Sequence, residues 1–121
     1  MRVYIAGPIS LGDLGQNLRQ AVSAANRLMS AGHHPFLPHL SIYWALLDPP
    51  KGGTVRDSHD VWLPYDLEWL RQCDALLRLP GASVGADREE VEAARNRIPV
   101  YRSVDEFLRY NPARRTLWAD S

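Results

Sequence analysis

A serine–glycine turn followed by a glutamate is the part of the chain best suited to chemistry. Ser83 and Gly85 follow an apolar run at residues 74–79, and Glu89 comes just after them in a helix-like run. The backbone N–H groups of such a turn, and of the helix it opens, are free to bind an anion. A carboxylate six residues after the serine can act on whatever is bound there. With Tyr4 at the end of a first strand, the pattern predicts a site for a phosphorylated or sugar-bearing ligand.

Strands and helices alternate along the chain, and this alternation predicts how the site is assembled. It is typical of an α/β fold, here with a parallel sheet of four or five strands and helices on both faces. Ligands of such sheets bind at the carboxyl ends of the strands, where we expect Tyr4, His39 and the Ser83 turn. Strands are predicted at residues 2–6, 34–40, 74–79 and 98–101. Two helices are predicted to follow the capping patterns at residues 13–16 and 103–106. A third helix is predicted to start near Pro64, and a fourth to span residues 87–96.

Residues 41–62 are the least regular stretch and are predicted to form a loop. Prolines and glycines at positions 49–53 favour this interpretation, and an ordered loop of such length in a small domain is often functional. Pro64 is expected in the first turn of the helix that follows. The whole chain is predicted to be one domain, residues 1–110, with a C-terminal tail at residues 111–121.

Composition excludes several classes of partner. The chain has 14 Lys and Arg against 14 Asp and Glu, so no basic field favours duplex nucleic acid or a membrane surface. Cys73 is the only cysteine, which rules out an internal disulfide and suits a reducing compartment. Residues 1–7 resemble a strand rather than a signal peptide, and no apolar run is long enough to span a membrane. We therefore expect a cytoplasmic protein with neither a nucleic acid polymer nor a membrane as its partner.

Three short segments occur in an order that is typical of one superfamily. They are residues 4–9 (YIAGPI), 65–74 (YDLEWLRQCD) and 83–89 (SVGADRE). In these segments the chain resembles the nucleoside 2-deoxyribosyltransferase superfamily, and within it the 2'-deoxynucleoside 5'-phosphate N-hydrolases and their small bacterial and phage relatives. The resemblance covers about residues 2–108. It implies a single Rossmann-like or flavodoxin-like domain, a homodimer or larger homo-oligomer, and a reaction without cofactor or metal.

The resemblance implies a role for each residue of the turn and its partners. Glu89 matches the glutamate that attacks the anomeric carbon of the sugar and displaces the nucleobase. Tyr4 matches the tyrosine that orients this glutamate, and Asp66 matches the aspartate that handles the base and its proton. Ser83 and Gly85 match the residues that hold the 5'-phosphate or 5'-hydroxyl end of the substrate.

Further substrate contacts are expected outside the turn. The first loop, with Gly7, Ile9 and Ser10, is expected to border the substrate, and His39 is matched to a histidine after the second strand. Arg88 is expected to pair either with a phosphate or only with solvent.

Two departures from the family pattern bear on the substrate. Relatives often carry glycine and an aromatic residue just before the glutamate, whereas this chain has Asp87 and Arg88, and Asp87 is a candidate helix N-cap. The nucleotide hydrolases place an arginine in the first loop where this chain has Ser10. A 5'-phosphate substrate therefore requires that Arg19, Arg88 or a partner subunit replace that cation.

The chemistry explains why these residue types are needed. Cleavage of an N-glycosidic bond passes through an oxocarbenium-like state, which a carboxylate beneath the sugar stabilises and can trap covalently. The base leaves more easily when protonated, so a second carboxyl group must hold a proton at the working pH. The predicted activity is hydrolysis of a (deoxy)nucleoside 5'-monophosphate. The alternatives are 2-deoxyribosyl transfer between free nucleosides, which uses the same residues, and nucleotide binding without turnover.

Each site residue also has a purely structural explanation. Glu89 could simply stabilise its helix by interacting favourably with the helix dipole. Asp66 could be an ordinary acid of a first helical turn. Tyr4 is common as a strand aromatic, and Ser83 and Gly85 are common turn residues. The order of the three segments favours the functional interpretation.

Other residues with chemical potential are assigned to structure. Cys73, Trp69 and Leu70 are expected in the core. Tyr43 and Trp44 suit stacking on a nucleobase, but equally a core or a dimer interface. The histidines fit no compact set of metal ligands, so no metal site is expected; they are His33, His34, His39 and His59.

Overall fold

A parallel sheet forms the centre of the molecule. The computed structural model describes residues 1–48 and 59–113, and the sheet in these residues has the strand order β2-β1-β3-β4. All three neighbouring pairs are parallel. This order is that of flavodoxin-like α/β proteins, so the predicted fold class is confirmed. The strands are β1 (Arg2–Ala6), β2 (His34–Phe36), β3 (Ala75–Arg78) and β4 (Val100–Tyr101).

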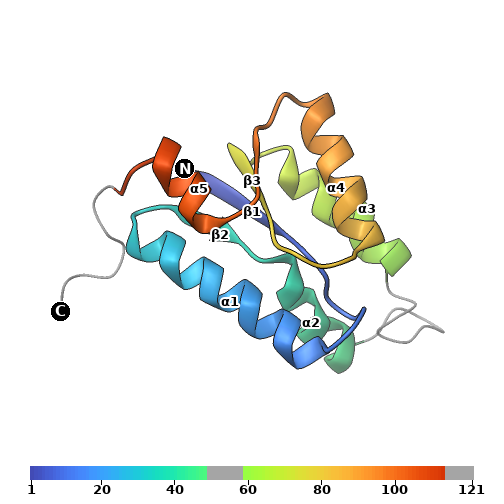
Figure 1. Ribbon diagram of the computed structural model, residues 1–121. Helices are drawn as coiled ribbons and strands as arrows, with labels where there is room; N and C mark the ends of the chain where they lie inside the picture. Colours follow the sequence, from blue (N-terminus) through green and yellow to red (C-terminus); the bar gives the residue numbers. More distant parts are fainter. Residues whose placement is uncertain (49–58, 114–121) are drawn as a thin grey trace.

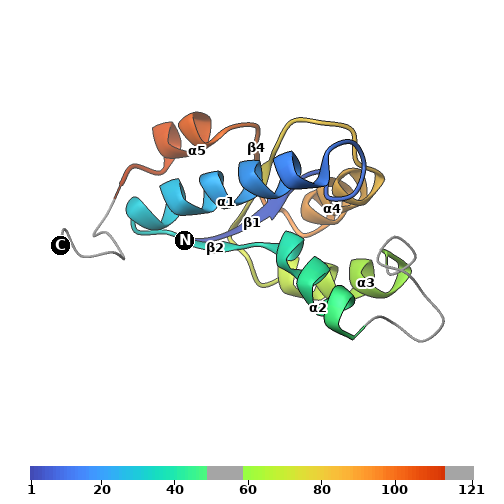
Figure 2. The same ribbon diagram turned by 90° about the horizontal axis from the view of Figure 1, so that it is seen from below.

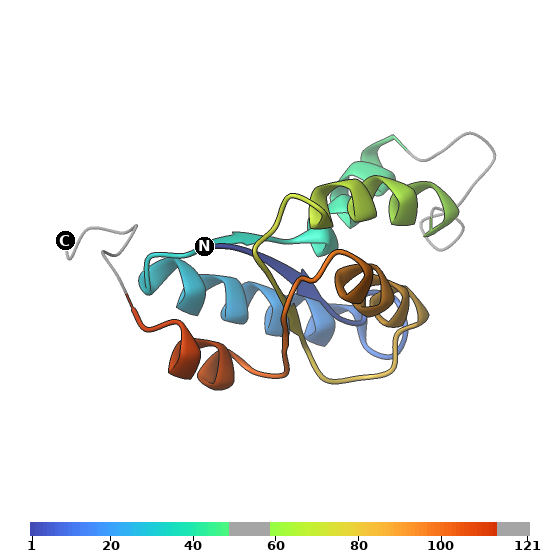
Figure 3. The ribbon, with the colours of Figure 1, turned by 90° about the horizontal axis from the view of Figure 1, so that it is seen from above.

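Helices cover both faces of the sheet. Helices α1 and α5 lie on one side of the strands, and α2 and α3 lie on the other, as Figures 1, 2 and 3 show from three directions. Helix α4 packs beside α3. The helices are α1 (Leu14–Ser30), the short 3₁₀ helix η1 (Pro38–Leu40), α2 (Ser41–Leu47), α3 (His59–Leu70), α4 (Val84–Arg95) and α5 (Val104–Tyr110).

Alternate strand residues divide the core between the two faces. Val3 and Ile5 of β1 pack in the cluster that contains α1 and α5. Tyr4, between them, packs with Leu76 and the residues of α3 and α4. Because successive side chains of a strand point to opposite faces, this register directs the Tyr4 phenol into the α3–α4 layer.

Side-chain caps define where three helices begin. Asp13 accepts a hydrogen bond from the backbone N–H of Gln16 (3.1 Å), and Ser103 does the same for Glu106 (3.0 Å), which confirms both predicted capping patterns. Ser83 caps α4 through the N–H of Ala86 (3.1 Å). Helix α4 therefore begins at Val84 rather than at residue 87, and the N-cap assignment of Asp87 is wrong.

Residues 34–48 differ from the prediction. Strand β2 ends at Phe36, and residues 38–40 form η1 instead of continuing the strand. Pro38 opens η1, because its missing N–H cannot join a sheet ladder but suits a helix start. Helix α2 then occupies the beginning of the predicted loop and buries Ile42 and Ala45, which lie three residues apart on one side. The loop prediction at residues 49–58 falls outside the described residues, as does the tail from residue 114.

Helix α3 also differs from the prediction. It begins at His59, so Pro64 lies inside the helix and not in its first turn. A proline inside a helix has no N–H and so removes one hydrogen bond between successive turns. The helix nevertheless continues on both sides of Pro64, from His59 to Leu70. Leu70 is fully buried as expected, but Trp69 is 48% exposed and is not a core residue. Cys73 is half-buried.

No helix of the described residues is both long and apolar enough to cross a membrane. The cytoplasmic location and the division into a domain of residues 1–110 and a tail stay predictions.

Gly81 allows the turn after β3 to pack closely against the first loop. It adopts a φ of +115°, and a Cβ at this position would lie 2.8 Å from Cγ of Pro8. We expect Gly81→Ala to lower the free energy of unfolding by about 1–3 kcal/mol, measured by denaturant titration. Gly12→Ala is the control, because Gly12 also has a positive φ (+84°) but open space around it. An equal loss in both variants would show that the contact with Pro8 is unimportant.

Candidate active site

A pocket of about 450 Å³ lies at the carboxyl ends of β1 and β3. The first loop, the η1–α2 segment, α3 and α4 all contribute to its wall. Eight predicted residues line it, namely Gly7, Ile9, Ser10, Asp66, Ser83, Gly85, Arg88 and Glu89. Eight others were not predicted, namely Leu11, Pro38, Ser41, Ile42, Trp62, Leu63, Val84 and Ala86.

Glu89 and Tyr4 form the buried centre of the site. The Tyr4 hydroxyl donates a hydrogen bond to Oε2 of Glu89, from β1 across to α4. Tyr4 is fully buried and stacks on Phe36, with ring centroids 5.5 Å apart. It lies in the middle of β1 and not at the strand end as expected, and it does not line the pocket itself. Tyr4 thus contacts Glu89 by a hydrogen bond without being part of the pocket wall.

The position of Glu89 does not fit the helix-dipole explanation. Because α4 begins at Val84, Glu89 is in the second turn, whereas the favourable effect of the dipole declines within the first turn. Asp87 occupies the first turn instead. Glu89 is only 6% exposed, and an acid is rarely buried to this degree unless it is paired or functional.

Asp66 is the second carboxyl group of the pocket. It is 6% exposed, and its Oδ1 has no hydrogen-bond partner among the described residues. Burial raises the pKa of Asp66 to about 7. Burial also raises the pKa of Glu89 to about 8, helped by the charge of Asp66 and opposed by the Tyr4 hydrogen bond and by Arg78. Both acids therefore titrate near neutral pH in the free protein.

One proton shared by two acids is the protonation state that the surroundings favour. Burial and the charge of Glu89 raise the pKa of Tyr4 well above its ordinary value, so Tyr4 keeps its proton and donates it in the hydrogen bond. The Tyr4 hydrogen bond favours the ionised form of Glu89, whereas Oδ1 of Asp66 has no donor among the described residues. Between their two pKa values the pair of acids holds a single proton. This gives one pocket an ionised acid and a protonated acid.

The polar end of the pocket is formed by the beginning of α4. The Ser83 hydroxyl accepts a hydrogen bond from the N–H of Ala86, and no group of the described residues accepts a hydrogen bond from it, so it can donate to a ligand. The N–H groups of the first residues of a helix have no partner within the helix, so those of Val84 and Gly85 can receive an anion. Arg88 is exposed, lines the pocket beside them and is the only cation among its described lining residues. This end is suited to a negatively charged substituent.

His39 is placed differently from its prediction. It is 1% exposed within η1 and does not line the pocket. Burial lowers the pKa of His39 to about 4, and the backbone of Pro8 opposes this shift. Neither ring nitrogen of His39 has a hydrogen-bond partner among the described residues. His39 is therefore neutral at pH 7. No group of three His, Cys, Asp or Glu residues in the described chain is arranged to hold a metal ion.

The part of the pocket wall that α2 and α3 contribute is apolar and aromatic. Ile42, Leu63 and Trp62 line it from α2 and α3. The Trp62 ring makes edge contacts with Trp44 (4.9 Å between centroids) and Tyr65 (5.4 Å). Trp62 is not among the predicted site residues. Its position four residues before Asp66 indicates that the two side chains share one side of the helix. A flat aromatic ligand group fits this part of the wall.

The protein is an α/β protein with a parallel sheet, in which two buried acids, on α3 and α4, and the start of helix α4 line one pocket. The chain belongs to the family described as a domain of unknown function, DUF7768, whose sequence profile matches residues 1–103. Its fold is similar to the structure of a 2-deoxyribosyltransferase from the psychrotolerant bacterium Bacillus psychrosaccharolyticus. That similarity has a TM-score of 0.57 at 19% sequence identity and covers 83% of this chain and 69% of the other. A search of curated proteins finds no match.

Proposed function

We propose that this protein hydrolyses the N-glycosidic bond of a (deoxy)nucleoside 5'-monophosphate and releases the nucleobase. The observation that carries the proposal is the buried pair of Tyr4 and Glu89 beside Asp66, an acid with a raised pKa in the same pocket. A nucleophile that is ionised and a proton donor that is not are the two groups this reaction needs. The fold similarity to a 2-deoxyribosyltransferase supports the same class of chemistry.

The reaction proceeds in two steps. A Glu89 oxygen forms a bond to C1' of the sugar while the bond between C1' and the base nitrogen breaks, and the departing base takes its proton from Asp66. Asp66, now ionised, then accepts a proton from a water molecule as that water attacks C1'. The bond between C1' and Glu89 breaks, and free Glu89 is restored. Tyr4 holds the Glu89 carboxylate in one orientation throughout.

The two ends of the pocket hold the two ends of the substrate. The Ser83 hydroxyl, the N–H of Gly85 and the Arg88 guanidinium bind the 5'-phosphate. Arg88 thereby replaces the arginine that the first loop lacks at Ser10. The apolar end, with Trp62, takes the base.

Self-association belongs to the proposal as well. Helices α2 and α3 carry large apolar side chains that stay exposed in the single chain, among them Trp44 (55%), Leu47 (88%) and Trp69 (48%). Such a concentration of exposed apolar area is typical of an interface. A homodimer is expected, and light scattering coupled to size-exclusion chromatography measures it.

Transfer of the sugar to a second base is the alternative that the fold similarity favours. Glu89 and Asp66 serve both reactions, because the covalent intermediate is the same and only the acceptor differs. Adding a second nucleobase to the reaction separates transfer from hydrolysis. A new nucleoside indicates a transferase, and free sugar indicates a hydrolase.

The decisive experiment is a chromatographic assay for released nucleobase. Purified protein is incubated with deoxy- and ribonucleoside 5'-monophosphates and with the matching nucleosides, with Glu89→Ala as the control. Release from monophosphates that is lost in the variant supports the hydrolase. Release from nucleosides alone overturns the monophosphate assignment, and a nucleotide that stays intact while bound indicates a binding domain without turnover.

Arg88 is expected to determine the preference for a 5'-phosphate. Arg88→Gln should raise KM for a monophosphate by about 10- to 100-fold and leave KM for the nucleoside nearly unchanged, because one charged hydrogen bond contributes about 1.5–3 kcal/mol. Steady-state kinetics on both substrates tests this. Arg95→Gln is the matched control, since Arg95 is an exposed arginine of the same helix and does not line the pocket. Equal effects on nucleotide and nucleoside would contradict the assignment.

A further inference from the structure

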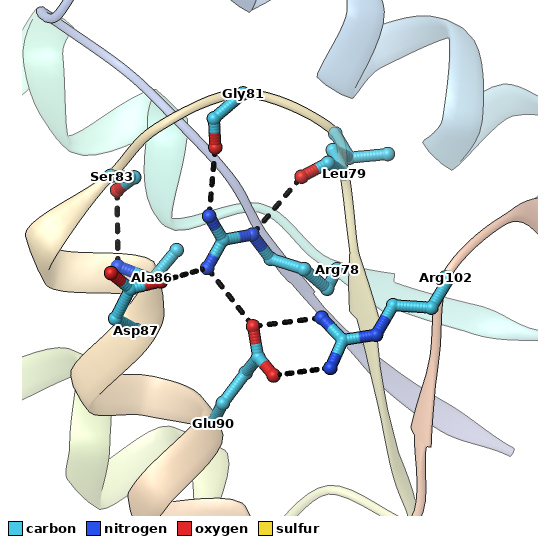
Figure 4. A network of polar contacts seen from close by, with 8 residues as sticks. All are labelled: Arg78, Leu79, Gly81, Ser83, Ala86, Asp87, Glu90 and Arg102. Atoms are coloured by element: carbon cyan, nitrogen blue, oxygen red, sulfur yellow. Dashed lines mark hydrogen bonds and ion pairs between the residues drawn. The ribbon is translucent and has the colours of Figure 1, made fainter.

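Arg78 is a buried arginine directly behind the turn that carries Ser83. It is the last residue of β3 and only 9% exposed. Two of its hydrogen bonds go to carbonyls of the turn, from Nε to Leu79 (3.1 Å) and from Nη2 to Gly81 (2.8 Å), as Figure 4 shows. The guanidinium therefore spans the turn from the inside.

The same guanidinium also holds helix α4. Its Nη1 donates to Oδ1 of Asp87 (2.8 Å) and to Oε2 of Glu90 (3.0 Å). Asp87 and Glu90 are three residues apart and therefore share one side of the helix, whereas Glu89 points to another side, toward Tyr4. Glu90 is in turn held by Arg102 from the segment after β4, with Nη2 2.7 Å from Oε1 (Figure 4).

This arrangement is more than a way to neutralise a buried charge. An arginine out of water is unfavourable unless its donors are matched, and here two carboxylates and two carbonyls match them. Every one of these partners lies in the turn or in the first two turns of α4. Those are the segments that carry Ser83, Gly85 and Glu89. A hydrophobic residue at this position would fill the space but could not connect the turn to the helix.

We propose that Arg78 is a positioning residue for the reaction described above, and this inference rests on that proposed function. Arg78 fixes the turn at residues 79–83 and the start of α4 against the end of β3. In this position the α4 N–H groups and the Glu89 carboxylate face one pocket at the same time. Arg78 does not line the pocket, so it acts on the substrate only through these groups.

The charge of Arg78 supports the same conclusion. Three groups face Glu89 from the elements around it: Tyr4 on β1, Asp66 on α3 and Arg78 on β3. The Tyr4 hydrogen bond and the Arg78 charge lower the pKa of Glu89, whereas burial and Asp66 raise it. Arg78 therefore helps to keep the nucleophile ionised.

Two variants separate the geometric effect from the charge. In Arg78→Met both are lost, so kcat should fall by about 10²-fold with a smaller change in KM, and the ascending limb of the kcat–pH profile should move to higher pH. In Arg78→Lys the charge stays but the planar fork is lost, so kcat should fall while the ascending limb stays near its wild-type position. Arg102→Gln is the matched control, because it removes the other cation on Glu90 and leaves the four hydrogen bonds of Arg78 intact.

Failure of the inference about Arg78 can be distinguished from failure of the proposed function. If the wild-type protein releases base and a folded Arg78→Met variant has wild-type kcat and pH profile, the inference is overturned. If the wild-type protein releases no base, the proposed function fails, and a ¹³C NMR titration of Glu89 tests Arg78 without turnover. A Glu89 pKa that is unchanged in Arg78→Met would then overturn the inference, and a raised pKa that Arg78→Lys restores would support it. Circular dichroism and thermal unfolding verify that each variant is folded.

Discussion

Glu89→Ala is expected to abolish base release, with a loss in kcat of about 10⁴-fold or more, while the nucleotide still binds. The loss follows because no other described carboxylate of the pocket is held by Tyr4, so no second group can take over the attack on C1'. Release of base and binding of the intact nucleotide are measured separately, by chromatography and by calorimetry.

Chemical rescue makes this test specific for a nucleophile. In Glu89→Ala the space beneath the sugar is empty, and a small anion such as azide can attack C1' in place of the side chain. Partial recovery of base release, with a sugar azide as the product, is expected. A variant that keeps wild-type kcat, or a Glu68→Gln control that loses as much activity as Glu89→Ala, would disprove the assignment.

The same residue is expected to reduce the stability of the free protein at alkaline pH. The pKa of Glu89 is raised to about 8 in the folded state, so the folded state binds this proton more tightly than the unfolded state does. The protonated Glu89 therefore contributes favourably to the free energy of unfolding. This contribution is complete below the ordinary carboxyl pKa and is lost as pH rises to about 8. Glu89→Gln keeps an acceptor for Tyr4 without the charge. It should therefore gain stability over the wild type on the order of 1–3 kcal/mol at pH 8, and little at pH 4.

Asp66→Asn is expected to have the second large effect, because it removes the proton donor for the departing base. A positioned general acid contributes about 10²- to 10⁴-fold, so base release should fall by that factor. A substrate with a nitrophenolate leaving group in place of the base needs no proton, and its cleavage should be much less affected. Glu68→Gln is the matched control, as an exposed acid two residues further along α3. Equal losses on both substrates would show that Asp66 is not the acid.

The pH profile gives an independent test of the two acids. With pKa values raised to about 7 for Asp66 and about 8 for Glu89, the pair holds one proton in between. The profile of kcat/KM should therefore be a narrow bell with its maximum between these values. In Asp66→Asn the profile of kcat/KM should keep only its ascending limb. The midpoint of this limb should lie below pH 8, because the charge of Asp66 no longer raises the pKa of Glu89.

Errors in the sequence prediction are concentrated where tertiary packing overrides local pattern. The sequence pattern predicts a loop where helix α2 lies, because the two buried residues of α2, Ile42 and Ala45, are too few to give a clear helical period. The pattern favours Asp87 as the N-cap of α4, although Ser83 offers the same capping chemistry one turn earlier. The apolar character of Trp69 predicts a core position, but Trp69 lies on the exposed side of α3.

The sequence by itself determined the features that depend on a few consecutive residues. The strand at residues 2–6, the caps at Asp13 and Ser103, and the alternation that predicts a parallel sheet all result from interactions within one or two helical turns or one strand. Short-range hydrogen bonds and steric limits act in the same way wherever the segment lies in the fold.

Only the tertiary structure decided which of these residues act together and in which charge state. Tyr4 meets Glu89 across 85 residues of chain, and Arg78 connects the turn to α4 through four hydrogen bonds. The raised pKa of Asp66 and the lowered pKa of His39 result from burial, which depends on side chains distant in the sequence. A sequence pattern can therefore identify an acid and its helix, but the exclusion of water that sets its protonation exists only after the sheet and helices have packed.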